Sequence, residues 1–206
     1  RHRDAARAHA EAVLLVNPKS GSGKKYTEII TPIYDEIVKS YSTKIWTSAF
    51  HGENANKIVF SKSPIIIKKE NPSAITDNFT AEDNIYAMIY LNDFLKNATN
   101  LKFSVLLYVD GNDNSSASFR WPLDNELSEQ TYYACDLVPP ANTTNKRMVA
   151  EYALALSKLL PGVHKVKVEI QDNADNVITA GEFNIDCSKG MDKLKTTALA
   201  LEDKIL

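Results

Sequence analysis

The sequence predicts a mainly β protein: an antiparallel β-sandwich with a short N-terminal α/β segment and one or two added helices. Short runs of β-branched and aromatic residues recur from residue 57 to residue 187. Residues that favour turns separate these runs, and one run near the C-terminus alternates apolar with charged residues. We therefore expect an N-terminal helical or α/β segment over 1–54, a β-sandwich domain over 55–190 and a C-terminal helix over 191–206.

The composition is typical of a globular domain and argues against two classes of partner. Of the 206 residues, 44% are hydrophobic and 24% are charged, and the formal net charge is −2. A chain so close to neutrality lacks the basic surface that nucleic acids require. No window approaches the roughly 18 apolar residues of a membrane span. We expect no nucleic-acid partner and no membrane span, and the composition leaves the oligomeric state open.

The N-terminal segment has the pattern of an α/β unit. An apolar run over 13–16 leads into a loop rich in Gly and Ser, and apolar residues at helical spacing follow over 26–41. Proline is favoured at the first position of a helix and threonine at its N-cap. Thr31 and Pro32 therefore predict a helix from about residue 32 to residue 41.

The strands of the sandwich are predicted from short runs of apolar residues bounded by turn formers. These runs lie at 57–60, 64–69, 84–91, 102–110, 118–121, 131–138, 163–170 and 176–187. The clearest is VHKVKVEI, in which Val166, Val168 and Ile170 alternate with charged residues. The polar residues 171–176 that follow it predict a hairpin loop.

Two helices are predicted near the C-terminus. Residues 145–160 place apolar side chains at helical spacing, and Pro161 and Gly162 end the pattern. Residues 192–206 read as a terminal helix. The helix that leads through SKLLPGVHKVKVEI to a final hairpin resembles the end of many immunoglobulin-like sandwiches. This resemblance implies an immunoglobulin-like architecture and no particular activity.

The stretch VNPKSGSGKK, residues 16–25, has the composition of a phosphate-binding loop. Backbone amides freed by glycine beside a lysine can hold a phosphate. The order of strand, N-P-x-S-G-x-G-K-like loop and proline-interrupted helix over residues 13–32 resembles the first phosphate loop of the diacylglycerol- and sphingosine-kinase superfamily. The resemblance implies an ATP-dependent lipid kinase-like protein that uses the Asn17–Lys24 loop for phosphate, with magnesium supplied from outside the loop.

The rest of the chain departs from that kinase pattern. Such kinases resemble one another most in a later G-G-D-G-T segment, whereas no two of the seven glycines here are adjacent. The loop also does not match the Walker A pattern. The four histidines have no spacing typical of a metal motif, and His51 is expected in a solvated loop. DGNDNSS, from Asp110, is expected to form a turn, with adventitious calcium binding as the alternative. We predict no catalytic, cofactor-binding or metal-binding residue.

The first functional hypothesis is therefore a non-enzymatic binding or interaction module for a carbohydrate or protein ligand, and the lipid kinase-like protein is its alternative. Loops at the ends of the sandwich, including 110–117 and 139–145, would carry recognition. Four tyrosines are candidates for a binding face, although tyrosines in strands also pack against the sheet. They are Tyr86, Tyr90, Tyr132 and Tyr133.

The two cysteines, Cys135 and Cys187, both have strand-like neighbours. We predict that they lie on strands of the sandwich and form a disulfide, with two buried free thiols as the alternative. A disulfide would place the protein in an oxidising compartment. The sequence thus predicts an exported protein, secreted or periplasmic.

Overall fold

The computed structural model describes residues 32, 36, 45–143 and 147–202. Contacts divide the chain into two units, Arg1–Thr47 and Ser48–Leu206. In the first unit Pro32 and Glu36 are helical, as the predicted helix over 32–41 requires. The remainder of that helix, the strand at 13–16 and the loop Asn17–Lys24 lie outside the described residues.

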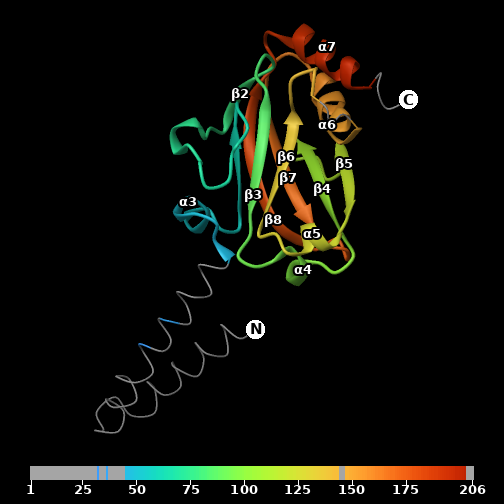
Figure 1. Ribbon diagram of the computed structural model, residues 1–206. Coiled ribbons are helices and arrows are strands. Elements are labelled where there is room, and N and C mark those ends of the chain that lie inside the picture. Colours follow the sequence, from blue (N-terminus) through green and yellow to red (C-terminus); the bar gives the residue numbers. More distant parts are fainter. Residues whose placement is uncertain (1–31, 33–35, 37–44, 144–146, 203–206) are drawn as a thin grey trace, which may run out of the picture. The chain divides into compact units, whose positions relative to one another are not determined.

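The second unit is mainly β, as predicted (Figure 1). Its strands are β1 (Lys57–Ser61), β2 (Asn78–Thr80), β3 (Ile85–Tyr90), β4 (Lys102–Val109), β5 (Ala117–Pro122), β6 (Tyr132–Val138), β7 (Val163–Gln171) and β8 (Val177–Asp186). They form a three-stranded sheet in the order β1-β3-β6 and a five-stranded sheet in the order β2-β8-β7-β4-β5. The neighbouring strands are antiparallel except for the parallel pair β2–β8. The predicted hairpin loop lies between β7 and β8.

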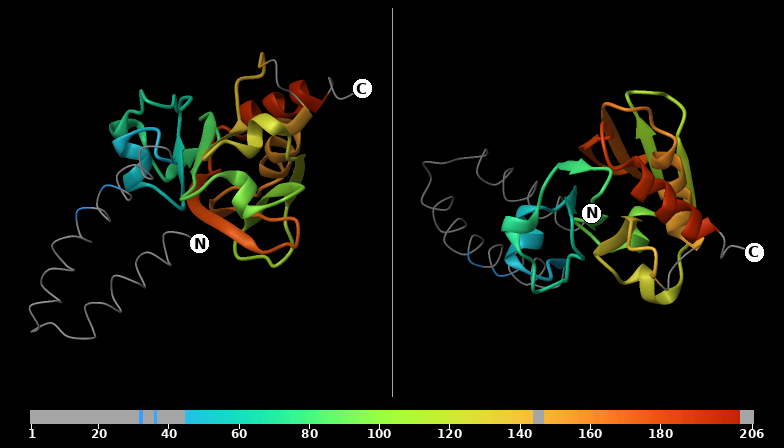
Figure 2. Two further views of the ribbon diagram at one scale, coloured as in Figure 1. Left: turned by 60° about the horizontal axis from the view of Figure 1, so that its bottom comes forward. Right: turned by 90° about the horizontal axis from the view of Figure 1, so that it is seen from above.

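Short helices connect the strands, and two longer helices lie at one end of the sheets (Figures 1 and 2). The short helical segments are α3 (Ala49–Glu53), η1 (Pro72–Ala74), α4 (Leu95–Ala98) and α5 (Asn125–Ser128). The longer ones are α6 (Arg147–Ser157) and α7 (Met191–Glu202), which pack against each other. Both were predicted. Tyr152 of α6 donates its hydroxyl proton to the Val105 carbonyl at 3.1 Å, which ties this helix to β4.

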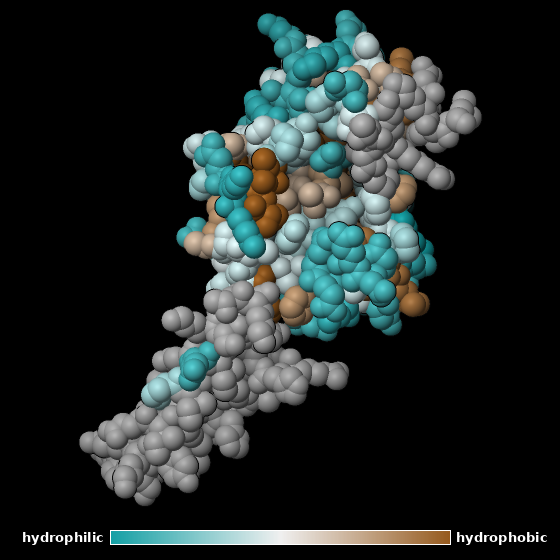
Figure 3. All heavy atoms as spheres, in the orientation of Figure 1, coloured by the Kyte–Doolittle hydropathy of each residue, from teal (hydrophilic) through white to brown (hydrophobic). Residues whose placement is uncertain are grey.

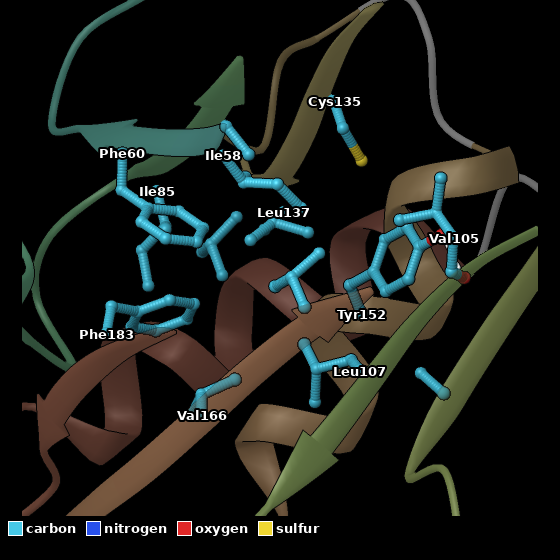
Figure 4. Packing of buried hydrophobic residues seen from close by; sticks show 14 of the residues in the cluster. Ile58, Phe60, Ile85, Val105, Leu107, Cys135, Leu137, Tyr152, Val166 and Phe183 are labelled. Carbon is cyan, nitrogen blue, oxygen red and sulfur yellow. Dashed lines mark hydrogen bonds between the residues drawn. The ribbon is translucent and has the colours of Figure 1, made fainter. Parts of the chain in front are cut away.

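The hydrophobic core lies between the two sheets (Figure 4). Phe60 and Ile85 point from the three-stranded sheet toward Phe183 of β8, and the Phe60 and Phe183 rings are 4.9 Å apart. The predicted alternation in β7 is confirmed, because Val166 and Ile170 are fully buried in this core. Burial of large apolar side chains from both sheets is what holds the two layers together.

The two sheets are in close contact where β1 passes over β8. A Cβ atom at Gly181 would lie 2.7 Å from Ile58 Cβ and 2.8 Å from the Ile58 carbonyl oxygen. The Thr179 hydroxyl donates to the Asn56 carbonyl at 2.8 Å on the same side. Glycine is therefore required at position 181 by the closeness of the neighbouring strand.

The predicted strand over 64–69 is wrong. Pro64 has no amide proton for a ladder, and Lys68 adopts a φ of 66°, which strands do not use. Ile65 and Ile67 instead pack onto the outside of the three-stranded sheet. The run therefore covers a sheet through two partly buried isoleucines and does not extend one, and Ile66 between them is exposed.

The predicted disulfide is also wrong, because Cys135 and Cys187 are both free and buried. Cys135 lies on β6 in the three-stranded sheet, whereas Cys187 directly follows β8 in the five-stranded sheet. The two strands are not neighbours, so no strand pairing brings the thiols together. Burial raises the pKa of the Cys135 thiol to about 12, which leaves it in the unreactive protonated form at neutral pH.

Candidate functional site: the outer face of the three-stranded sheet

Alternate residues of β1, β3 and β6 point away from the core, because successive side chains of a strand lie on opposite faces. These residues form three cross-strand rows, which together we call the tyrosine face. The rows are Lys57–Tyr90–Tyr132, Val59–Met88–Ala134 and Ser61–Tyr86–Asp136. Three of the four tyrosines predicted to line a binding face meet here. The fourth, Tyr133, points into the core, where its ring contacts Phe103 and Trp121.

One half of the tyrosine face is covered by the chain itself. Helix α3 places the Phe50 ring 5.7 Å from the Tyr90 ring, and Ile65 and Ile75 pack onto the same cluster. The Glu70 carboxylate accepts hydrogen bonds from the hydroxyls of Ser48 at 2.9 Å and Tyr90 at 3.4 Å. This half is closed, so Tyr90 is fully buried and packs against the sheet, the alternative that the sequence left open for it.

His51 belongs to this cover and does not lie in a solvated loop, which corrects the sequence-based expectation. It is fully buried on α3, its ring lies 4.8 Å from that of Tyr90, and Nε2 donates to the Leu91 carbonyl at 2.9 Å. Burial lowers the pKa of His51, so the ring is neutral at pH 7. The residue is a structural part of the cover.

The other half of the tyrosine face, along β6, is open. Ala134 is exposed, and Tyr132 and Asp136 are partly exposed beside it. Figure 3 shows brown, hydrophobic atoms near the middle of the visible face, with hydrophilic atoms above and below them. The small side chain of Ala134 thus leaves an accessible surface between two polar groups, the Tyr132 hydroxyl and the Asp136 carboxylate.

Asp136 is the chemically distinctive residue of the open half. Among the described residues, no hydrogen bond or ion pair reaches its carboxylate, and burial raises its pKa above the ordinary value. Burial also raises the pKa of the neighbouring Tyr86, and the negative charge of Asp136 raises it further. A partly buried carboxylate without a partner is unfavourable, and a cation or a hydrogen-bond donor would relieve that cost.

The loops predicted to carry recognition have fewer groups available to a ligand than the tyrosine face has. Residues 111–116 are exposed and form the turn between β4 and β5, but the Asp110 carboxylate already binds the His164 ring at 2.7 Å and the Lys165 amide at 2.9 Å. The described part of the loop 139–145 ends in a turn closed by the Thr143 amide and the Pro140 carbonyl. The other carboxylate of the first loop, Asp113, is exposed to solvent, so it does not bear the cost of burial that Asp136 does.

A hollow of about 320 Å³ lies at the opposite end of the sandwich, between α4 and the β7–β8 turn. Its acidic group, Asp172, accepts hydrogen bonds from the amides of Ala174 and Asn176. The Lys96 ammonium is paired with Glu129 at 2.5 Å. Both charged groups of the hollow therefore already have partners within the fold: those of Asp172 in the β7–β8 turn and that of Lys96 at the end of α5. Across the described residues, no group of three or more His, Cys, Asp or Glu side chains is placed to hold a metal ion.

No protein-family model matches the chain, and a search of curated proteins finds no similar sequence. None of the helices within the described ranges is long and apolar enough to cross a membrane. The site is therefore defined by its geometry. Sequence reasoning missed Asp136, although the alternation in TYYACDLV carries the signal: Asp136 shares a strand face with Tyr132 and Ala134.

Proposed function

We propose that the chain is a non-enzymatic binding module, which binds a carbohydrate or protein ligand through the open half of the tyrosine face. The observation that carries this proposal is Asp136, a partly buried carboxylate without a partner among the described residues. A free protein retains such a group at a cost in stability, and ligand sites are where that cost is commonly found. Tyr132 adds the aromatic surface that sugars and protein side chains both contact.

The proposal includes an immunoglobulin-like topology, which the strand order supports. In that fold strands A, B and E share one sheet and strands C, F and G share the other. With β1, β3 and β6 as A, B and E, the remaining core strands β4, β7 and β8 take the places of C, F and G. Strand β5 then adds to the edge beside C, as in variable-type domains.

An exported location, secreted or periplasmic, is proposed with this architecture. Its support is the sandwich alone, because the free thiols of Cys135 and Cys187 remove the argument from a disulfide. Fractionation of the native source tests it. Recovery with cytosolic markers contradicts export.

A paired array experiment tests the binding module. A glycan array and a peptide array are probed with the wild-type protein and with Asp136→Asn, Tyr132→Ala and the control Asp113→Asn. Asp113 is an exposed carboxylate in the β4–β5 turn, so its substitution removes the same charge away from the tyrosine face. Binding that is lost in both face variants and retained in the control supports the proposal. Equal binding by all four proteins contradicts it.

The lipid kinase-like alternative has a separate test. The melting temperature is measured with and without millimolar Mg-ATP for the wild type and for Gly23→Asp. A ligand that binds only the folded state raises the melting temperature. We expect no rise for the binding module. A rise that disappears in Gly23→Asp contradicts a pure binding module and favours phosphate binding by the Asn17–Lys24 loop.

A further inference from the structure

The direction of the β6 backbone groups follows from one hydrogen bond. The Leu91 amide donates to the Thr131 carbonyl at 2.9 Å, just beyond the register pair Tyr90–Tyr132. Hydrogen-bonded and non-hydrogen-bonded pairs alternate along an antiparallel ladder. The backbone of Thr131 therefore faces β3, and that of Tyr132 faces the opposite way.

The same alternation continues along β6. Tyr133 and Cys135 direct their N–H and C=O groups to β3, whereas Tyr132, Ala134 and Asp136 direct theirs to the outer edge of the sheet. These three residues are also the ones whose side chains lie on the tyrosine face. One edge of β6 thus presents alternating backbone donors and acceptors next to the unpaired carboxylate.

No other strand in the described residues pairs with this edge, since β6 ends the order β1-β3-β6. Figure 1 shows α6 beside the upper end of β6. The other sheet edges carry the usual protections against strand pairing, whereas on β6 the protection is helix α6 beside its upper end. β2 has three residues, β5 ends in Pro122, and β1 lies against β8. β6 has seven residues and contains neither Pro nor Lys.

We propose that the β6 edge accepts an extended peptide segment of a partner protein as an added strand, with a Lys or Arg of that segment paired to Asp136. This inference rests on the proposed binding function and assigns its ligand. Added strands obtain affinity from main-chain hydrogen bonds and specificity from alternate side chains. The same three residues of β6, Tyr132, Ala134 and Asp136, offer both: backbone groups at the strand edge and side chains on the tyrosine face.

The Asp136 carboxylate determines which side chain an added strand must carry beside it. A strand added to β6 lies about 4.8 Å from it, and its outward side chains stand opposite or diagonal to Asp136. A cation in that position offsets the burial of the carboxylate and forms a charge-assisted hydrogen bond, whereas an acidic side chain is repelled. Ala134 leaves space between the two ends of the face, so a long Lys or Arg side chain can lie along it.

The direct test uses three synthetic heptapeptides that alternate Val and Thr. The first has Arg at its central position, the second has Glu there, and the third is the Arg peptide with alternate backbone amides methylated. Binding is measured by fluorescence anisotropy, and NMR shifts of the β6 amides locate it. We expect the Arg peptide to bind at least about tenfold more tightly than the Glu peptide, the factor that one charge-assisted hydrogen bond supplies. Methylation of the amides that face β6 abolishes binding.

Two variants complete the test. Asp136→Asn removes the preference for Arg, while the control Asp113→Asn keeps it. Ala134→Pro removes an N–H that faces the outer edge, so the variant folds with an unchanged circular dichroism spectrum and binds neither peptide. If Ala134→Pro does not fold, the methylated peptide tests the same hydrogen bonds from the ligand side.

The outcomes separate this inference from the proposed function. Equal binding of the Arg and Glu peptides, or an undiminished Arg preference in Asp136→Asn, overturns the inference. Glycans that bind in an Asp136-dependent way, without any peptide binding, overturn the added strand and leave the binding module intact. Absence of both glycan and peptide binding at the tyrosine face overturns both.

Discussion

The outer faces of the two sheets differ in whether their charged side chains are paired. On the five-stranded sheet Lys165 pairs with Glu182 at 2.6 Å, and Lys167 pairs with Glu169 at 2.8 Å. On the three-stranded sheet the Asp136 carboxylate has no partner among the described residues. Both faces lie outside the core, so the contrast does not follow from position in the fold.

The difference indicates which face has its charged groups satisfied in the free protein and which face lacks a partner among the described residues. Opposite charges on the same face of a sheet satisfy each other, within β7 and between β7 and β8, and a face built in this way gains little from a further partner. On the three-stranded sheet, a ligand that paired with the Asp136 carboxylate beside the strand edge would offset the cost of burying that charge, so this face is stabilised more by a partner. The comparison therefore assigns a structural role to the five-stranded face and a binding role to the three-stranded one.

The largest expected effect is loss of the packing that holds the two sheets together. Gly181→Ala places a methyl group 2.7 Å from Ile58 Cβ and 2.8 Å from a backbone oxygen that cannot move freely. We expect destabilisation of about 3 kcal/mol from overpacking, measured by urea unfolding. Ala180→Ser is the matched control, because Ala180 is exposed on the same strand. Equal stability of the two variants would refute the close approach of β1 and β8.

The second effect concerns a charge pair at the end of the five-stranded sheet. His164 Nδ1 lies 2.7 Å from Asp110 Oδ2, and Nε2 lies 2.8 Å from the Leu160 carbonyl oxygen. Both partners are acceptors, so both ring nitrogens carry protons and the ring is cationic. The hydrogen bond to Asp110 is the largest cause that raises the pKa of His164 above its ordinary value.

This pair predicts a pH-dependent contribution to stability. Because the folded pKa is raised, the contribution is complete below the ordinary value of 6.5 and is lost as the pH rises through the folded pKa. We expect His164→Ala to cost about 1.5 kcal/mol near pH 6, allowing for solvent screening, and less near pH 9. Thermal unfolding at the two pH values measures the difference. A pH-independent loss argues against the cationic ring.

Glu169 supplies a smaller effect on the paired face. Burial is the largest influence on its pKa and raises it, but the hydrogen bonds from Lys167 and Gln171 outweigh burial and hold the pKa below its ordinary value. Its stabilisation is therefore present above pH 4.5 and is lost as the pH falls through the folded pKa. We expect Glu169→Gln to cost about 1 kcal/mol at pH 7 and less in acid, by urea unfolding. A stabilising substitution would contradict the pairing.

The smallest expected change in stability is a gain and not a loss, and it compares the two sheet faces directly. Asp136→Asn removes an unpaired charge, so we expect a gain of about 0.5 kcal/mol at pH 7, allowing for solvent screening of this half-buried group. The gain disappears below the ordinary pKa of 3.8, where the carboxyl group is protonated in both states. The same chemical change thus stabilises at residue 136 and destabilises at residue 169. Destabilisation at both positions means that Asp136 has a partner in the free protein.

Local patterns were sufficient to predict most strands. Strand β7 was readable because Val166, Val168 and Ile170 alternate with charges, and a period of two is a local property. The run over 64–69 has the same β-branched composition, but Pro64 and the positive φ of Lys68 turn it into a cover for another sheet. Composition therefore predicted a strand where the chain forms a cover, and only the tertiary structure reveals that Ile65 and Ile67 pack against another sheet.

The site was harder to predict because it depends on strand neighbours. Tyr86 and Tyr132 were candidates for a binding face, yet their meeting with Asp136 follows from the pairing of β3 with β6, which local patterns do not encode. His51 appeared solvated beside Gly52 because nothing local indicates its contact with Tyr90 and the Leu91 carbonyl. Both cases concern contacts between residues distant in sequence.

An NMR titration of the Asp136 carboxyl carbon in the free protein measures the pKa on which the proposed binding role of this residue depends. This carboxylate is partly buried and has no partner among the described residues, so burial raises its pKa. We expect a midpoint above the ordinary value of 3.8, and a fall of that midpoint when the Arg heptapeptide is bound. The titration of Asp113 in the same spectra is the internal reference. A midpoint for Asp136 at or below 3.8 in the free protein would contradict the binding role assigned to this residue, because it would mean that the carboxylate is already solvated or paired.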